Sequence, residues 1–223
     1  MPKLKDNLIP LTITLLITLL FIVITLSVNN FYNNIFRLSK DTVTNSLNKQ
    51  TSQCSNIIDC QLLPGDILIR RYITQKTRLV DKVLHPYFTH SAFYLGQGQI
   101  IEAIGQEKTH ADEIRITNLT NTDWIDSTME SWVIIRPKKI TPSSLEIINN
   151  NFQIIANDPD YRFGIPKNNN KKTTCADLIY QQLIKQNIIK DSVPPKYITP
   201  DYLYWLAINK PNDFEIIARN IIK

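Results

Sequence analysis

An uncharged apolar run near the N-terminus limits what this chain can fold into. Residues 8–28 include no charged side chain over 21 positions and are mostly Leu, Ile, Val and Thr. With a rise of 1.5 Å per residue, a helix of this length spans roughly the 30 Å of a bilayer core. The run therefore predicts a membrane-spanning helix. A cleaved signal peptide is the alternative, although the run is longer than a usual signal-peptide core and no small-residue cleavage motif follows it.

The charges that flank this run indicate an orientation. Lys3 and Lys5 lie before it, whereas Arg37 and Lys40 lie nine or more residues beyond it. Because positive charges favour the cytoplasmic side of a membrane, we expect a cytoplasmic N-terminus. The expected protein is a single-pass membrane protein whose remaining residues lie on the extracytoplasmic side.

The rest of the chain divides into a polar segment and a folded domain. Residues 29–61 are rich in Asn, Ser, Thr and Lys, which is typical of a stalk. The turn signal Leu63-Pro64-Gly65-Asp66 and the β-rich run Ile67-Leu68-Ile69 then open the domain. The predicted organisation is a flank at 1–7, an anchor at 8–28, a stalk at 29–61 and a domain at 62–223.

Composition and charge argue against several classes of function. The lysines behind the formal charge of +5 are scattered along the chain, so we expect no nucleic-acid partner. The histidines and cysteines show no paired short spacing of the zinc type, so neither a metal nor another cofactor is expected. Cys54 and Cys60 are close enough in sequence to form a disulfide in an oxidising compartment, or both are reduced surface cysteines. The oligomeric state is left open.

Hydrophobic patterns in residues 62–223 predict an α+β fold with an antiparallel sheet. Strands are expected at 67–69, 89–95, 99–104, 114–116, 132–136 and 214–217. Gly96-Gln97-Gly98 is expected to form a three-residue hairpin loop. Helices are expected from Ser143 to just before Asp158, directly after Thr174, and from Pro200 through Trp205.

Cys175 lies where a thiol is readily activated. Thr174 suits an N-cap and Asp177 would complete a capping box, with apolar residues following at helical spacing. Cys175 would then lie in the first helical turn, where unpaired N–H groups and the helix dipole favour a thiolate. A thiolate is the form that attacks carbonyl carbon. The alternative is a small buried apolar residue at the start of an amphipathic helix.

His90 and Glu102 are candidate partners for this thiol. The expected hairpin pairing puts Ala92 opposite Glu102, with His90 diagonally across from Glu102 on the same face. A slip of one residue would separate them. A thiol nucleophile needs a base and a group that orients the base, and an imidazole with a carboxylate supplies both. Alternatively, His90 is an ordinary strand residue and Glu102 a solvated surface charge.

Four motifs occur in an order that resembles a known family. They are Leu63-Pro64-Gly65-Asp66-Ile67-Leu68, Thr89-His90-Ser91-Ala92-Phe93-Tyr94-Leu95-Gly96, Ile101-Glu102-Ala103 and Thr174-Cys175-Ala176-Asp177-Leu178-Ile179-Tyr180. With histidine before cysteine, the chain resembles the permuted NlpC-type papain-fold hydrolases, the YiiX/YebB-like group, over roughly residues 63–206. The resemblance implies a circularly permuted papain-like fold in which the sheet packs against the cysteine helix. It also implies Cys175 as nucleophile, His90 as base and Glu102 as the polar third residue.

The expected function is that of a membrane-anchored thiol hydrolase. Cys175 would attack an amide carbonyl of a cell-wall peptide or a related substrate and form a thioacyl intermediate, which water then hydrolyses. Backbone N–H groups at the start of the cysteine helix would bind the oxyanion. One alternative is a hydrolase or acyltransferase of lipid acyl substrates on the same fold. Another is a tethered binding module without catalysis.

Overall fold

The computed structural model describes residues 13–27, 54, 56–72, 87–105, 112–125, 129–165, 171–191 and 194–221. Most of the predicted stalk, and residues 8–12 and 28 of the predicted anchor, lie outside these residues. The described part folds as a mixture of helices and an antiparallel sheet, which confirms the predicted α+β class.

The central feature of the fold is a six-stranded sheet with the order β4-β3-β2-β1-β5-β8. Its strands are β1 (Ile67–Tyr72), β2 (His90–Gly96), β3 (Gln99–Ile104), β4 (Glu113–Asn118), β5 (Met129–Pro137) and β8 (Phe214–Ile221). Every neighbouring pair is antiparallel, as predicted. Two short strands, β6 (Arg162–Phe163) and β7 (Lys172–Thr173), form a separate parallel pair.

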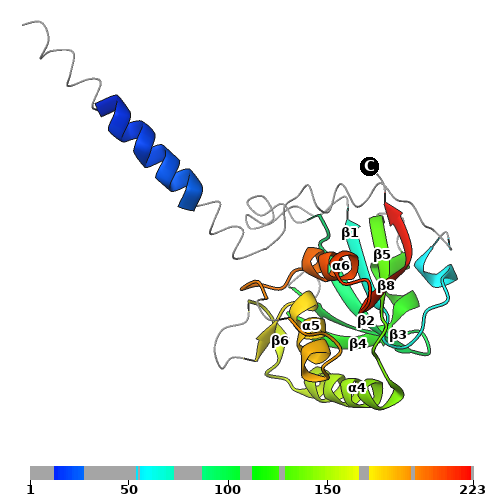
Figure 1. Cartoon of the computed structure of the whole chain (residues 1–223). Helices are drawn as coiled ribbons and strands as arrows, with labels where there is room; N and C mark the ends of the chain where they lie inside the picture. Colours follow the sequence, from blue (N-terminus) through cyan, green and yellow to red (C-terminus); the bar gives the residue numbers. More distant parts are fainter. Residues whose placement is uncertain are drawn as a thin grey trace, which may run out of the picture.

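Three helices pack against one face of this sheet in the described part of the chain (Figure 1). They are α4 (Pro142–Asn157), α5 (Cys175–Lys185) and α6 (Pro200–Asn209). Each begins after a threonine whose side chain accepts a backbone N–H, and these N-caps are Thr141, Thr174 and Thr199. An N-cap of this kind satisfies one of the N–H groups that a helix leaves unpaired at its start. The helices therefore begin at or close to the predicted residues.

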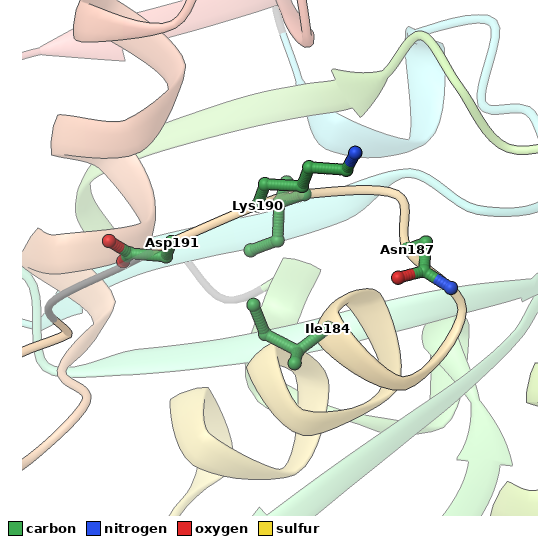
Figure 2. A pocket seen from close by; sticks show the side chains of 5 residues that line it. Ile184, Asn187, Lys190 and Asp191 are labelled. Atoms are coloured by element: carbon green, nitrogen blue, oxygen red, sulfur yellow. The ribbon is translucent and has the colours of Figure 1, made fainter.

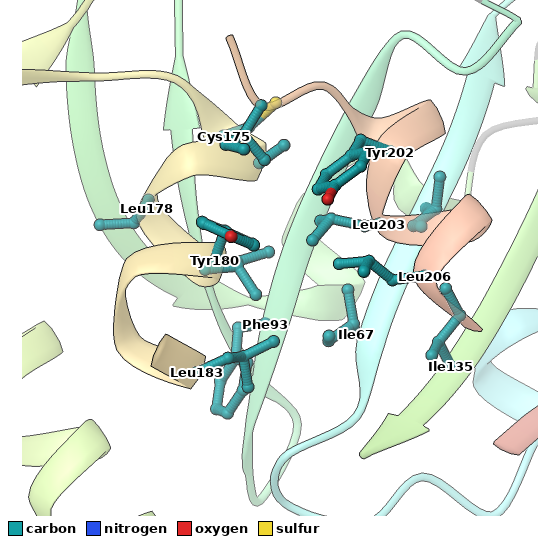
Figure 3. Packing of buried hydrophobic residues seen from close by; sticks show 14 of the residues in the cluster. Ile67, Phe93, Ile135, Cys175, Leu178, Tyr180, Leu183, Tyr202, Leu203 and Leu206 are labelled. Atoms are coloured by element: carbon teal, nitrogen blue, oxygen red, sulfur yellow. The ribbon is translucent and has the colours of Figure 1, made fainter. Parts of the chain in front are cut away.

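The sheet is apolar on both faces because both faces are covered. Ile67 and Ile69 of β1 pack with the helices, and Figure 3 shows Ile67 with Phe93 and Ile135 beneath α5 and α6. Leu68, between them, packs into a second core on the opposite face. Alternate side chains of a strand point to opposite faces, so a strand covered twice is a continuous apolar run. The Ile-Leu-Ile run reflects this arrangement.

Short 3-10 helices cover the second face. They are η1 (Ile57–Asp59), η2 (Leu119–Asn121) and η3 (Asp123–Ile125). Ile57 of η1 and Trp124 of η3 are both buried in the second core. Packing of the domain thus extends upstream of the predicted boundary at residue 62. The structure also joins Cys54 and Cys60 in a disulfide that closes the loop containing η1, which decides between the two alternatives left open.

The β2–β3 hairpin differs from its prediction at the turn. Gly96 belongs to β2 and pairs with Gln99, so the loop has two residues, Gln97 and Gly98, rather than three. Both have positive φ, 52° and 76°, as the favoured two-residue hairpin turns require. A register shift between Tyr94 and Gly96 absorbs the extra residue. The pairing of Phe93 with Ile101 is unaffected, so the predicted alignment of the strands beyond the turn is retained.

Residues 13–27 form a helix whose side chains are exposed. Within the described residues, no helix has both the length and the apolar character needed to cross a membrane.

Candidate active site

Cys175 is the first residue of α5 and a buried free cysteine. The Thr174 hydroxyl accepts the N–H of Asp177 at 3.2 Å, as expected of the N-cap. The Asp177 carboxylate does not complete the predicted capping box, because it accepts from the Thr173 hydroxyl and the Gln181 amide. The first intrahelical hydrogen bond is made by the N–H of Leu178 to Thr174, so the N–H of Cys175 lies in the turn before it. That turn carries the positive end of the helix dipole, beside the sulfur.

His90 is the first residue of β2 and contacts Glu102 on β3. Its Nε2 atom lies 2.9 Å from Oε2 of Glu102, and only 12% of the histidine side chain is exposed. The predicted histidine–carboxylate pair is therefore present. Because Nε2 is engaged by the carboxylate, Nδ1 is the ring nitrogen that can serve a second partner such as a thiol.

The Cys175 thiol and the His90 imidazole lie close enough to shift each other's pKa. Burial raises the pKa of the Cys175 thiol, but the hydrogen bond with His90, the charge of His90 and the adjacent Ser91 outweigh burial, so the net pKa is lowered. Burial lowers the pKa of His90, but its hydrogen bonds with Cys175 and Glu102 outweigh burial and raise the pKa to about 9. Both shifts favour the thiolate and the imidazolium over the neutral thiol and imidazole.

Glu102 is buried among donors that keep it ionised. Oε2 accepts from His90 and from the indole N–H of Trp124 at 2.9 Å, and Oε1 accepts from Nε and Nη2 of Arg115 at 3.1 and 2.8 Å. Burial raises the pKa of the Glu102 carboxyl, but the hydrogen bond and charge of His90 and the Trp124 N–H hold it well below its usual range. Glu102 is thus a buried carboxylate rather than the solvated charge considered as an alternative.

Trp124, Arg115 and Arg70 were not among the predicted site residues. Arg115 lies directly opposite Glu102 in the β3–β4 register, and Arg70 lies opposite His90 in the β1–β2 register. The Arg70 guanidinium stacks 4.1 Å from the centre of the Trp124 ring, which is itself tilted against the His90 ring. The sequence contains one weak signal, a tryptophan in the mainly polar loop before β5. The two arginines reach the site through the strand register, which is visible only in the three-dimensional structure.

The segment that leads into the cysteine helix is fixed by β6 and β7. The Gly164 N–H donates to the Thr173 carbonyl at 2.9 Å, which ties residues 161–165 to the strand just before Cys175.

A shallow cavity of about 470 Å³ lies elsewhere in the helical layer (Figure 2). It is lined by Ile184, Asn187, Ile189, Lys190 and Asp191. These residues lie at and beyond the C-terminal end of α5, whereas Cys175 is at the N-terminal end, roughly 15 Å away along the helix axis. The cavity therefore contains none of the predicted site residues.

Within the described residues, no group of three or more His, Cys, Asp and Glu side chains is arranged to hold a metal ion.

No protein-family model and no curated protein matches this chain. Among solved structures, it is similar to the crystal structure of YiiX from Escherichia coli O157:H7, whose description names it a metalloprotein and DUF1105. The TM-score is 0.48 and the identity 11%, over 73% of this chain and 99% of that one. A similarity at this level carries no conclusion about the activity of this protein.

Proposed function

We propose that this protein is a thiol hydrolase that cleaves amide bonds with Cys175 as nucleophile, His90 as general base and acid, and Glu102 as the group that orients His90. The observation that carries the proposal is a thiol and an imidazole that shift each other's pKa, with the imidazole hydrogen-bonded to a buried, ionised carboxylate. Nucleophile, base and orienting group in this order are the requirements for acyl transfer through a covalent intermediate.

The proposed reaction has two steps. The Cys175 thiolate attacks the carbonyl carbon, and the His90 imidazolium protonates the leaving amine, which gives a thioacyl intermediate. Neutral His90 then takes a proton from water, which attacks the thioacyl carbon. The C–S bond breaks, which releases the acid and restores the Cys175 thiolate beside the His90 imidazolium. The N–H groups of the first turn of α5 are the proposed oxyanion donors.

The permuted papain-like fold and the membrane anchor belong to the same proposal. The strand with the histidine precedes the helix with the cysteine, and α5 packs on β2 and β3, as the resemblance implies. The uncharged run at 8–28 supports a membrane anchor, and the Cys54–Cys60 disulfide supports an oxidising, extracytoplasmic location. An intact N-terminus in membrane extracts is the expected result, and a mature chain that begins near Asn29 would contradict the anchor.

Thiol reactivity tests the catalytic assignment without a known substrate. At pH 6 the full chain is expected to react with iodoacetamide about tenfold or more faster than free cysteine, because a larger fraction of Cys175 is thiolate. His90→Ala should abolish the difference. Cys175→Ala is the control and should not react, since Cys54 and Cys60 are joined in the disulfide. Equal rates for the protein and free cysteine would favour the binding module.

A direct comparison of substrates identifies the bond that is cleaved. The full chain is incubated with muropeptides and with phospholipid vesicles in parallel, and the products are analysed by mass spectrometry. Products from muropeptides that depend on Cys175 are expected. Fatty acid released from phospholipid instead would support the lipid acyl hydrolase, the second candidate, which the apolar run at 8–28 favours.

A further inference from the structure

Asp201 is a buried carboxylate that the proposed reaction does not use. It is the second residue of α6, after the N-cap Thr199 and Pro200. Its Oδ1 accepts the N–H of Phe88 at 2.7 Å, and its Oδ2 accepts the N–H of Tyr87 at 2.8 Å. Both oxygens therefore hold the backbone of a segment more than a hundred residues away in sequence.

The segment held by Asp201 leads directly to His90. The Phe88 ring is fully buried and packs edge-on against Tyr204 of α6, with ring centres 5.2 Å apart. The N–H of Thr89 then donates to the Arg70 carbonyl at 2.9 Å, which begins the pairing with β1. Two residues before His90 the chain is thus fixed to α6, and at His90 it is fixed to the sheet.

The same helix is tied to the cysteine helix. The Asp191 carboxylate accepts from the hydroxyls of Tyr180 in α5 and Tyr202 in α6. Figure 3 shows the two tyrosines between these helices, below Cys175, and their rings pack edge to face. The Thr174 hydroxyl, next to Cys175, also donates to the Ile198 carbonyl just before α6 at 3.4 Å. α6 is therefore a common support for the thiol and the imidazole.

We propose that Asp201 is a positioning residue that sets the separation of His90 from Cys175 by holding the backbone of Tyr87 and Phe88 against α6. This inference rests on the proposed role of the thiolate–imidazolium pair. Such a pair needs its two groups within hydrogen-bond reach, so a displacement of about 1 Å in the histidine strand weakens it.

The ionisation of Asp201 fits this role. Burial raises its pKa to about 6, although the N–H groups of Phe88 and Tyr87 and the charge of Arg71 oppose the rise. At pH 7 and above the side chain is therefore a carboxylate, which accepts a hydrogen bond on each oxygen. Asparagine at this position keeps one acceptor oxygen and turns an N–H donor toward the other backbone N–H.

The test compares Asp201→Ala and Asp201→Asn with Asp66→Asn in the full chain. Asp66 is a matched control because it is also a buried carboxylate and accepts two hydrogen bonds from Arg136, at 2.7 and 2.8 Å. It lies at the hairpin end of β2, where its carbonyl accepts the Tyr94 N–H, and His90 is at the other end of that strand. Each variant is measured for its thermal unfolding midpoint and for the rate of Cys175 alkylation from pH 5 to 10.

Both Asp201 variants should raise the apparent pKa of the Cys175 thiol, and Asp201→Ala should lower the alkylation rate at pH 6 by about tenfold, the effect of one pKa unit. Asp66→Asn should lower the unfolding midpoint without changing the pH profile. If folded Asp201→Asn keeps the wild-type profile, or if Asp66→Asn shifts it equally, the inference is overturned while the proposed function stands. A wild-type thiol of ordinary reactivity would overturn both.

Discussion

Glu102 receives four hydrogen bonds from three side chains, and this number explains why a carboxylate can stay charged inside the second core. A buried charge is costly unless its lone pairs are satisfied and opposite charge is close. Arg115 supplies a permanent positive charge, and Trp124 supplies a neutral donor with an apolar ring that excludes water. The carboxylate in turn fixes which nitrogen of His90 faces the thiol.

The stability of the protein should therefore depend on pH through Glu102. The pKa of this carboxyl is lowered in the folded state from its usual 4.5, so the unfolded state takes up the proton first as the pH falls. The free energy of unfolding should fall below pH 4.5, by up to about 1.4 kcal/mol per pH unit for one proton. Glu102→Gln removes this slope, which urea unfolding between pH 3 and 5 measures. Glu113→Gln, on the neighbouring strand with an exposed carboxylate, is the control and should keep the slope; identical slopes for wild type and Glu102→Gln would contradict the prediction.

Among the elements, α5 carries Cys175, and the sheet carries His90 on β2 and Glu102 on β3. The helix begins at Cys175 because Thr174 caps it, so the sulfur lies at the end of the helix that favours negative charge. β2 and β3 pair in the register that places Glu102 within reach of His90. A shift of one residue in either strand would turn the imidazole and the carboxylate to opposite faces.

Removal of the Thr174 N-cap tests whether the start of α5 affects the reactivity of Cys175 as well as the stability of the fold. Thr174→Ala should lower the free energy of unfolding by about 1 kcal/mol, the usual cost of losing a threonine N-cap. It should also slow alkylation of Cys175 at pH 6, because the first-turn N–H groups are no longer held beside the sulfur. Thr141→Ala removes the corresponding cap of α4 and is the control, with a similar loss of stability and unchanged alkylation. Equal rates of Cys175 alkylation in the two variants would argue against a contribution of the helix start to the reactivity of the thiol.

At the scale of the whole molecule, the sheet separates two apolar cores that pack against different elements. The core on the helical face contains Cys175 and orders α4, α5 and α6. The core on the other face contains Trp124 and is completed by Ile57 from η1. The disulfide between Cys54 and Cys60 closes the η1 loop, so a covalent link upstream of the sheet supports the face on which Glu102 is held.

Reduction of this disulfide should weaken the folded state. In a Cys175→Ala background, dithiothreitol should lower the free energy of unfolding by about 2 kcal/mol, as expected for a short loop. Urea unfolding followed by tryptophan fluorescence is suitable because Trp124 lies in the core beside η1. The variant that also carries Cys54→Ser and Cys60→Ser should not respond to the reductant. An unchanged midpoint in the disulfide-containing protein would show that the disulfide does not contribute to stability.

The sequence by itself determined the local features of this protein. The strands, the helix starts and the position of Cys175 in a first turn follow from apolar periodicity and from capping side chains within a few residues. The hairpin loop was predicted with three residues and has two, Gln97 and Gly98. A glycine suits the end of a strand with positive φ as well as it suits a loop, and Gly96 is the last residue of β2. Only the tertiary structure decided that Arg115, Trp124 and Asp201 serve the site. Their contacts join residues separated by 13 to 114 positions, and such contacts depend on strand order and register, which no local pattern encodes.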